Sequence, residues 1–250
     1  MKEYDLSKTT LISFEINNDC NMKHLHRECP INTRKYRKKE KTLTSKIIIE
    51  CINQAKDMNF NGYITFHNYN EPLISKEEML SVIDRLPQEK YLLWTNGLLL
   101  DRDMKKNEFL KKFKLIYISC YHPGHMAFFK EIQAFHGRVH IEEIKLDDRL
   151  DIYSREPDNI IGCKRPLFDL PIDHYGNVHL CCFDWNNEYE IGNIFYSSLK
   201  DIIHSDRYQK LLASSEKRLL DLNSCPVICK RCNAPWITYT KYYDIYEDSE

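Results

Sequence analysis

The chain has 250 residues, 42% of them hydrophobic, and a formal net charge of −1 at pH 7. This length suits one large α/β domain, or one domain with a small appendage. The balanced charge creates no overall field that would favour nucleic acid. The first residues form no apolar signal region, and no apolar run is long enough to cross a bilayer. We therefore expect a cytoplasmic protein with neither a membrane nor a nucleic-acid partner.

Ten cysteines are present. In a reducing compartment such cysteines rarely form disulfides, and ligation of a metal ion or an iron–sulfur cluster is the more common use.

A β-branched, alternating stretch predicts a buried strand over Leu11–Ile16. The loop after it holds Cys20, His24, His26 and Cys29, four ligand-type side chains within ten residues. Such a loop at the carboxyl end of a first strand is typical of a metal or iron–sulfur site. The alternative is two surface histidines that happen to lie near two thiols.

The basic run over Arg34–Lys41 is interpreted as a solvated loop, since it lacks the series of stacking aromatics that a nucleic-acid platform needs.

Strands and helices then alternate. Helices are predicted at Thr44 or Ser45 to Met58, Lys76–Arg85, Met104–Phe113 and Met126–Phe135, and strands at Tyr63–His67, Tyr91–Trp94, Leu115–Cys120 and Val139–Leu146. This spacing, with five strands in all, predicts a parallel sheet or barrel with crossover helices. Ligands of such folds bind at the carboxyl ends of the strands, where the loops 17–30, 68–72 and 95–97 fall.

The pattern changes after about residue 150. Stretches at Leu167–Ile172 and Val178–Leu180 flank a turn-forming segment and predict a hairpin. A helix is expected over Ser198–Leu212, before a cysteine-rich tail. We expect a first domain over residues 1–156 and a small second domain over 157–250.

Together these motifs resemble the radical S-adenosylmethionine (radical SAM) enzymes: a strand, a cysteine loop, a second strand ending in Glu71-Pro72 and a third ending in Thr95-Asn96-Gly97. The spacing Cys163-x12-Gly176-x4-Cys181, followed by Cys229-x2-Cys232, resembles the SPASM/twitch extension, which binds an auxiliary [4Fe–4S] cluster. In length and order the chain is most similar to twitch-type dehydrogenases with an abridged barrel. The resemblance implies an α/β fold: a partial parallel β/α barrel of the radical SAM type with a small C-terminal cysteine-rich twitch/SPASM domain. It also implies two [4Fe–4S] clusters and S-adenosyl-L-methionine (SAM) as cofactors.

The resemblance carries residues over to the SAM site. Glu71 would take the amino group of SAM through a charge-assisted hydrogen bond, and Pro72 would hold the turn. The other candidates for binding SAM are Tyr69, Asn70, Thr95, Asn96 and Ser119.

The cluster motif departs from the family's Cys-x3-Cys-x2-Cys, because this chain has Cys20-x8-Cys29. We prefer Cys20, His26 and Cys29 as ligands of the SAM cluster. His24, in the other register, and Cys120, at the end of the fourth strand, are alternatives for the third ligand. An imidazole in place of a thiolate removes a negative charge and raises the reduction potential, which makes SAM cleavage harder.

The auxiliary cluster would be held by Cys163, Cys181, Cys229 and Cys232, which leaves Cys182 and Cys225 without a role. Four thiolates also suit a structural zinc ion. We favour the cluster because the barrel motifs accompany these cysteines.

The predicted function is that of a radical SAM oxidoreductase. A 5′-deoxyadenosyl radical would abstract hydrogen from a small polar metabolite, such as a sugar or aminocyclitol, and the auxiliary cluster would accept an electron. Arg155 matches an arginine that faces substrate in the dehydrogenases and is the catalytic candidate. A reductase or flavodoxin-type protein would donate electrons.

Two other functions compete with this one. A peptide-modifying maturase or an epimerase is the first. Peptide maturases usually carry an extra peptide-recognition domain before the barrel, whereas about ten residues precede the first strand here, and we therefore favour a small molecule. The second is a non-catalytic metal- or cluster-binding protein on a degenerate radical SAM scaffold.

Overall fold

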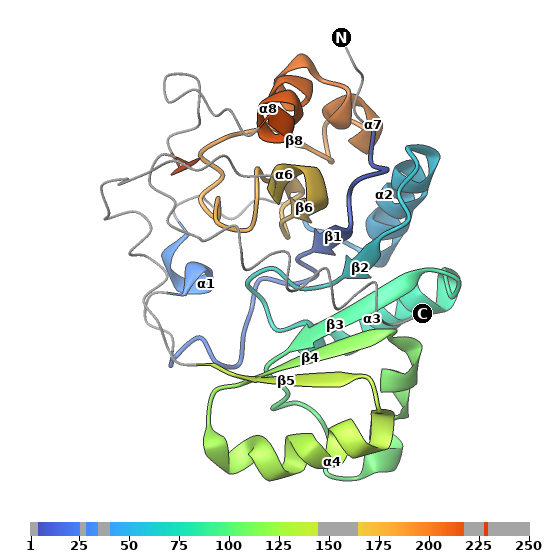
Figure 1. Ribbon diagram of the computed structural model, residues 1–250, viewed down its shortest axis with the longest axis vertical. Helices are drawn as coiled ribbons and strands as arrows, with labels where there is room; N and C mark the ends of the chain where they lie inside the picture. The colour runs from blue at the N-terminus through green and yellow to red at the C-terminus, as the bar shows by residue number, and fades with distance from the viewer. Residues whose placement is uncertain (1–4, 26–28, 35–40, 145–164, 218–227, 230–250) are drawn as a thin grey trace.

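The computed structural model describes residues 5–25, 29–34, 41–144, 165–217 and 228–229 (Figure 1). No helix in these ranges is long and apolar enough to span a membrane.

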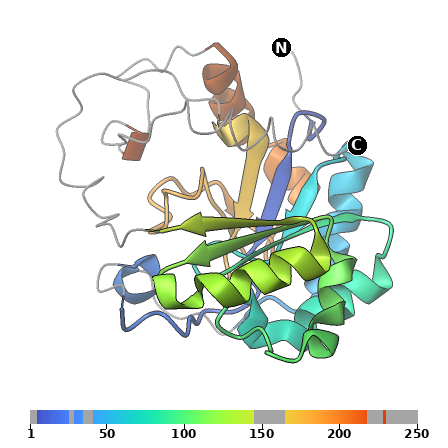
Figure 2. The ribbon, with the colours of Figure 1, turned by 60° about the horizontal axis from the view of Figure 1, so that its bottom comes forward.

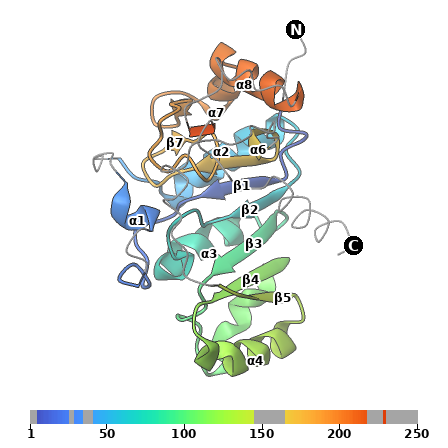
Figure 3. The ribbon, with the colours of Figure 1, turned by 60° about the vertical axis from the view of Figure 1, so that its left-hand side comes forward.

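The described strands form one sheet in the order β5-β4-β3-β2-β1-β6-β7-β8 (Figure 3). Their bounds are β1 Leu11–Phe14, β2 Tyr63–Thr65, β3 Lys90–Thr95, β4 Leu115–Cys120, β5 Val139–Glu143, β6 Asp169–Ile172, β7 Asn177–Val178 and β8 Gly192–Asn193. The pairs from β5 to β6 are all parallel, whereas β7 and β8 add to the sheet in antiparallel fashion. The carboxyl ends of β1, β2 and β3 therefore lie side by side at one edge.

Helices connect the parallel strands and pack against one face of the sheet (Figure 2). They are α2 Ser45–Asp57, α3 Lys76–Arg85 and α4 Met126–His136, with the 3₁₀ segments η1 Pro72–Ser75, η2 Met104–Lys112 and η3 Pro123–His125. The short α1 Pro30–Thr33 belongs instead to the loop after β1. Each predicted helix up to residue 136 is confirmed to within two residues at its ends, except that 104–112 winds as a 3₁₀ helix.

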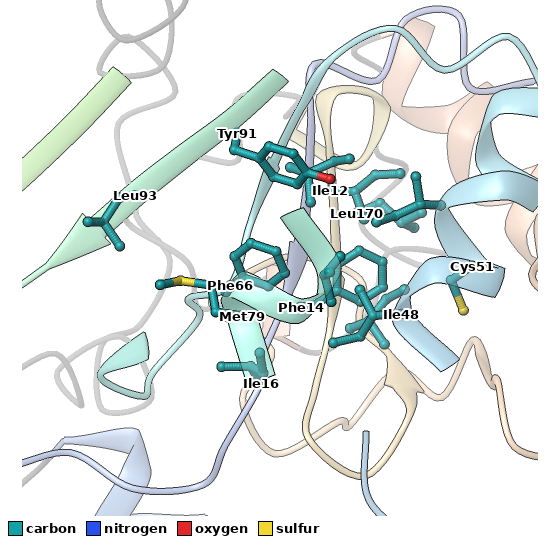
Figure 4. Packing of buried hydrophobic residues seen from close by; sticks show 14 of the residues in the cluster. Ile12, Phe14, Ile16, Ile48, Cys51, Phe66, Met79, Tyr91, Leu93 and Leu170 are labelled. Atoms are coloured by element: carbon teal, nitrogen blue, oxygen red, sulfur yellow. The ribbon is translucent and has the colours of Figure 1, made fainter. Parts of the chain in front are cut away.

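The main core lies between these helices and the sheet (Figure 4). Ile12 and Phe14 point into it from β1, and Ile48 meets them from α2; all three side chains are fully buried. Cys51 lies one turn further along α2 and is 4% exposed, as a core cysteine should be. Because side chains alternate along a strand, a second, smaller cluster forms on the opposite face, around Leu92, Leu115 and Tyr117.

The predicted helix over 198–212 is two helices, α7 Leu199–Ile203 and α8 Asp206–Lys217. Ser205 causes the break. Its hydroxyl donates to the Ile202 carbonyl at 2.7 Å, and it accepts the Tyr208 amide at 3.3 Å. A serine that bonds its neighbouring backbone in this way ends one helix and begins the next.

The hairpin predicted after residue 165 is confirmed by the antiparallel pairing of Ile172 with Val178. Gly176 takes the left-handed conformation that its turn requires, with φ of +78°. The predicted number of parallel strands, five, was one too few, because the first arm of this hairpin, β6, also pairs in parallel with β1. The sheet thus continues past residue 157, and the division into domains at that point stays a prediction.

Candidate functional site

The loops that follow β1 and β2 are tied together where the strands end. The Glu71 amide donates to the Asp19 carbonyl at 2.9 Å, and the Asn17 side-chain amide donates to the Glu71 carbonyl at 3.0 Å. Glu71 itself ends the loop after β2 and caps η1. The two loops with the predicted SAM and cluster ligands therefore form one layer at the carboxyl edge of the sheet.

Glu71 is 2% exposed, and its carboxylate is held by three donors. The Thr95 hydroxyl donates to Oε1 at 2.7 Å, and the Asn96 amide donates to Oε2 at 2.8 Å. The Leu73 amide also donates to Oε1, at 3.0 Å. Burial raises the pKa of Glu71 above its usual range, although these hydrogen bonds oppose the rise. A cation placed beside this carboxylate would stabilise the ionised form.

Asn96 joins this carboxylate to the cysteine loop. Its side-chain amide donates to the Asn21 side chain at 2.7 Å and lies 4.0 Å from the Cys20 sulfur. The next residue, Gly97, has φ of +74° and lets the chain turn sharply here. Predicted SAM-binding residues from two strands thus meet a predicted cluster ligand.

The cysteine loop is a series of turns that keeps Cys20 half-buried. The Met22 amide points at the Cys20 sulfur at 3.4 Å, the kind of contact that cluster thiolates accept. Burial, with the nearby charges of Glu71 and Cys29, raises the pKa of Cys20 to about 11. Cys29 directly precedes α1, and both Cys29 and Glu71 lie close enough to Cys20 to raise its pKa. Two soft ligands beside a buried carboxylate fit a cluster with SAM next to it.

Three candidates were predicted for the third ligand of this cluster. His26 lies outside them, and His24 is exposed. Cys120 is 3% exposed, packs in the main core, and donates from its sulfur to the His122 carbonyl at 3.2 Å. Within the described ranges, no three metal-ligating side chains converge.

Three other predicted SAM-binding residues make structural contacts. Asn70 is 2% exposed and uses its side chain to hold its own turn, donating to the Phe66 carbonyl at 3.1 Å. Ser119 lies on the face of β4 away from the helices, where it accepts a hydrogen bond from the Trp94 indole at 3.3 Å. Tyr69 is buried, and its hydroxyl reaches the Cys182 carbonyl.

The auxiliary-cluster set is described in part. Cys181 and Cys229 are half-buried and pack against the main core. Cys182, to which no ligand role was assigned, accepts a hydrogen bond at its sulfur from the Arg165 guanidinium at 2.6 Å. The predictions for Arg155, Cys163, Cys225 and Cys232 lie outside the described residues.

A buried charged pair stiffens the hairpin that leads to Cys181. His179 is 2% exposed, and its Nε2 lies 3.0 Å from the Asp173 carboxylate, while Nδ1 lies 2.6 Å from the Asp184 carbonyl. Both neighbours are acceptors, so the ring bears a proton on each nitrogen. Burial is the largest single effect and would lower the pKa of His179, but the hydrogen bonds and charges of Asp173 and Asp184 together outweigh it and raise that pKa.

Sequence reasoning missed a buried ion pair next to the site. The Arg34 guanidinium forms two hydrogen bonds with the carboxylate of Glu15, one of them at 2.6 Å, and the side chains are 6% and 0% exposed. The interpretation of Arg34 as part of a solvated loop was therefore wrong. The sequence did show that Glu15, a carboxylate within the predicted buried strand, needs a partner, but no local pattern identified that partner as Arg34.

Comparison with known proteins finds a matching family, a similar curated protein and similar solved structures. Residues 163–233 match the SPASM family, an iron-sulfur cluster-binding domain. The chain is 26% identical over 253 residues to the S-adenosyl-L-methionine-dependent 2-deoxy-scyllo-inosamine dehydrogenase of Niallia circulans, covering 94% of this chain and 97% of the relative. The fold matches that of BtrN in complex with AdoMet and 2-DOIA, with a TM-score of 0.70, 22% identity, and coverage of 93% and 94%. It also matches anSMEcpe with bound AdoMet, with a TM-score of 0.57, 12% identity, and coverage of 94% and 92%.

Proposed function

We propose that this chain, a radical SAM dehydrogenase homologue with a SPASM-type cluster-binding region, oxidises an alcohol group of a small polar metabolite of the sugar or aminocyclitol class. The resemblance recognised in its motifs, the fold class and the expectation of an enzyme are confirmed by the comparisons. The observation that carries the proposal is the Glu71 carboxylate, which Thr95 and Asn96 hold beside Cys20.

Glu71 is proposed to bind the ammonium group of SAM. Its two oxygens are oriented by fixed donors, so the carboxylate presents a preorganised negative charge in a buried place. Burial disfavours that charge while it is unpaired. Binding an ammonium ion would therefore lower the pKa of Glu71 and favour SAM over neutral analogues.

The proposed cluster ligands are Cys20, His26 and Cys29 for the SAM cluster, and Cys163, Cys181, Cys229 and Cys232 for the auxiliary cluster. When bound, SAM and the first cluster supply the radical that takes one hydrogen atom, and the second cluster supplies a place for one electron. The alcohol loses in addition one proton, which completes its conversion to a carbonyl. A reductase or flavodoxin-type protein is the proposed source of the electron that cleaves SAM.

Arg155 is proposed to contact the substrate hydroxyl. An arginine stays protonated in proteins and is a poor base, so its role is to orient the hydroxyl and stabilise developing negative charge on its oxygen. A neighbouring group or water then accepts the proton.

Peptide modification is the second candidate, since the fold also matches anSMEcpe with bound AdoMet and a peptide, with a TM-score of 0.57. The full-length relative that acts on 2-deoxy-scyllo-inosamine is more similar in sequence, and for this reason we favour the metabolite.

The test is anaerobic reconstitution followed by iron analysis and turnover. We expect about eight irons per chain, from two four-iron clusters, and formation of 5′-deoxyadenosine with SAM and a strong reductant. An aminocyclitol should be oxidised at one alcohol per SAM consumed. Stoichiometric zinc without iron, or a product at the oxidation level of the substrate, would rule the proposal out.

A pair of matched variants isolates the SAM site. Glu71→Gln should weaken SAM binding about tenfold or more, because a charge-assisted bond becomes a neutral one. Glu89→Gln is the control: Glu89 is 8% exposed and pairs with Lys56 at 3.1 Å, but it precedes β3 at the opposite edge of the sheet. Equal SAM affinity in the two variants would contradict the assignment of Glu71.

A further inference from the structure

Tyr69 connects two parts of the chain that are far apart in sequence. It directly precedes Asn70 and Glu71 in the turn of the SAM site. Its hydroxyl donates to the backbone carbonyl of Cys182, 113 residues away, which follows the proposed auxiliary-cluster ligand Cys181. The side chain is 8% exposed, so this hydrogen bond is shielded from water.

The Tyr69 ring is fixed by its neighbours. The Arg34 guanidinium lies over the ring face, 4.4 Å from the centroid, and is itself held by the Glu15 carboxylate. Trp185 meets the ring edge-on, with centroids 6.4 Å apart. A ring held on one face and at its edge keeps its hydroxyl in one place.

Burial, together with the nearby Cys182 sulfur, raises the pKa of the Tyr69 phenol well above its usual range. The hydroxyl therefore keeps its proton and remains a donor.

Two further contacts join the same parts of the chain. The His174 amide donates to the Glu15 carboxylate at 3.2 Å, and the Asn18 side chain donates to the Tyr175 hydroxyl at 2.8 Å. The hairpin that leads to Cys181 is thereby attached to the loop after β1, which also contains Cys20.

We infer that Tyr69 is a positioning residue that fixes the Cys181–Cys182 backbone against the SAM-binding turn, and so sets where the auxiliary cluster sits relative to SAM. This inference rests on the proposed function, in the ligand role of Cys181 and in the auxiliary cluster as the acceptor of the electron. Placement matters because the electron leaving the substrate must cross to the auxiliary cluster, and its transfer slows steeply as the gap widens. The Tyr69 hydroxyl–carbonyl bond lies at the junction of the two sites and controls that gap together with the Glu15–His174 and Asn18–Tyr175 contacts of the same hairpin.

The test compares Tyr69→Phe with Tyr91→Phe in anaerobically reconstituted holoprotein. Both changes delete one buried hydroxyl that donates to a backbone carbonyl, since Tyr91 is 1% exposed and donates to the Leu86 carbonyl at 2.9 Å. Tyr91 lies in the main core on the helix side of β3, away from the carboxyl edge. It therefore controls for a general loss of stability.

Hydrogen exchange is the first readout. The Asp184 amide bonds to the Cys181 carbonyl at 3.0 Å, and the Asn187 amide to the Asp184 carbonyl at 2.9 Å. Tyr69→Phe should speed exchange at these two amides about 2- to 10-fold, the equivalent of one lost hydrogen bond. Tyr91→Phe should leave them at the wild-type rate.

Electron paramagnetic resonance of the doubly reduced protein is the second readout. Tyr69→Phe should widen the range of magnetic coupling strengths between the two clusters, because their separation is no longer fixed. Tyr91→Phe should leave that range unchanged. Wild-type exchange and coupling in Tyr69→Phe would overturn the inference, as would equal changes in both variants.

One outcome separates this inference from the proposed function. A wild-type protein without a second cluster would refute the ligand role of Cys181, while the exchange measurement would still test the contact made by Tyr69. If Tyr69→Phe does not fold, Tyr175→Phe takes its place, since it removes the Asn18 contact of the same hairpin. Unchanged coupling and exchange in that variant would also overturn the inference.

Discussion

Replacing Arg34 with methionine should destabilise the protein severely. The change keeps most of the side-chain volume but leaves the Glu15 carboxylate, which is 0% exposed, without its charged partner. Breaking a buried ion pair from one side costs about 3–5 kcal/mol, because the remaining charge stays out of water. Domains are stable by only about 5–15 kcal/mol in total. For a chain of this size the loss corresponds to a drop of about 6–20 °C in the melting temperature.

The measurement is urea and thermal unfolding of the reconstituted protein without oxygen. Glu108→Gln is the control, since Glu108 pairs with Lys111 at 3.2 Å and both side chains are about 60% exposed. Exposed pairs contribute about 0–1 kcal/mol. The double variant Glu15→Gln with Arg34→Met should cost less than the two single changes added together, because it leaves no buried charge.

An Arg34→Met protein as stable as Glu108→Gln would refute this reasoning. It would mean that Glu15 is solvated and that Arg34 belongs to an exposed loop after all. An additive double variant would show that the two side chains do not interact.

Two other predictions concern one glycine and one histidine. Gly97→Ala should lower the free energy of unfolding by about 1–3 kcal/mol more than Gly137→Ala does. Both glycines have positive φ, but a Cβ at Gly97 would lie 2.7 Å from the Phe129 ring, whereas one at Gly137 meets nothing within 4 Å. Thermal unfolding of the two variants measures the difference, and a greater loss in Gly137→Ala would contradict the close approach at Gly97. Burial lowers the pKa of His136 below its usual 6.5, although the Leu110 carbonyl, 2.6 Å from Nε2, opposes this shift. The stability that depends on neutral His136 is therefore fully present above pH 6.5 and is lost as the pH falls through the folded pKa. Urea unfolding between pH 7 and 5 should show a smaller loss of stability in His136→Gln than in the wild type, and equal losses would contradict this prediction.

Local periodicity predicted most of the fold. In α2, buried residues recur at Ile48, Cys51, Ile52 and Ala55, and this spacing can be seen without knowing what they pack against. The order of strands and helices then limits the sheet to parallel connections.

The stretch Leu167–Ile172 was predicted as one arm of a hairpin, but its place as a sixth parallel strand beside β1 could not be predicted in the same way. All four residues of β6 are buried, so the strand has no alternation, and Pro171 lies within it. The strong turn at Gly176 instead pointed to a hairpin. Pairing with β1 depends on a return of the chain across more than 150 residues, which no local pattern encodes.

In the candidate site too, some residues could be found from local motifs, whereas others depend on contacts between distant parts of the chain. Glu71, Thr95 and Asn96 lie at or just after strand ends and could be found from short motifs. The contact between Glu15 and Arg34 could not, because the charge of Arg34 adjoins a run of basic residues that looks solvated. Only the folded loop brings that guanidinium against the end of β1.

The structure bears on the third ligand of the SAM cluster through strand parity. Cys120 has the same parity along β4 as Ile116 and Ile118, which pack in the main core, and the opposite parity to Ser119. Its sulfur thus faces the helices, and turning it toward Cys20 would require β4 to rearrange. This geometry favours a ligand from the cysteine loop.

We therefore expect His26→Ala to reduce the iron content from about eight to about four per chain, because losing a ligand disrupts a cluster, while Cys120→Ala keeps both clusters. His24→Ala should weaken the cluster by at most about 10–100-fold, the range for residues that support a ligand without binding the metal. Iron analysis and the SAM-dependent change in the paramagnetic resonance signal distinguish the three variants. If Cys120→Ala loses four irons and His26→Ala loses none, β4 must rearrange on cluster assembly and the assignment to the loop is wrong.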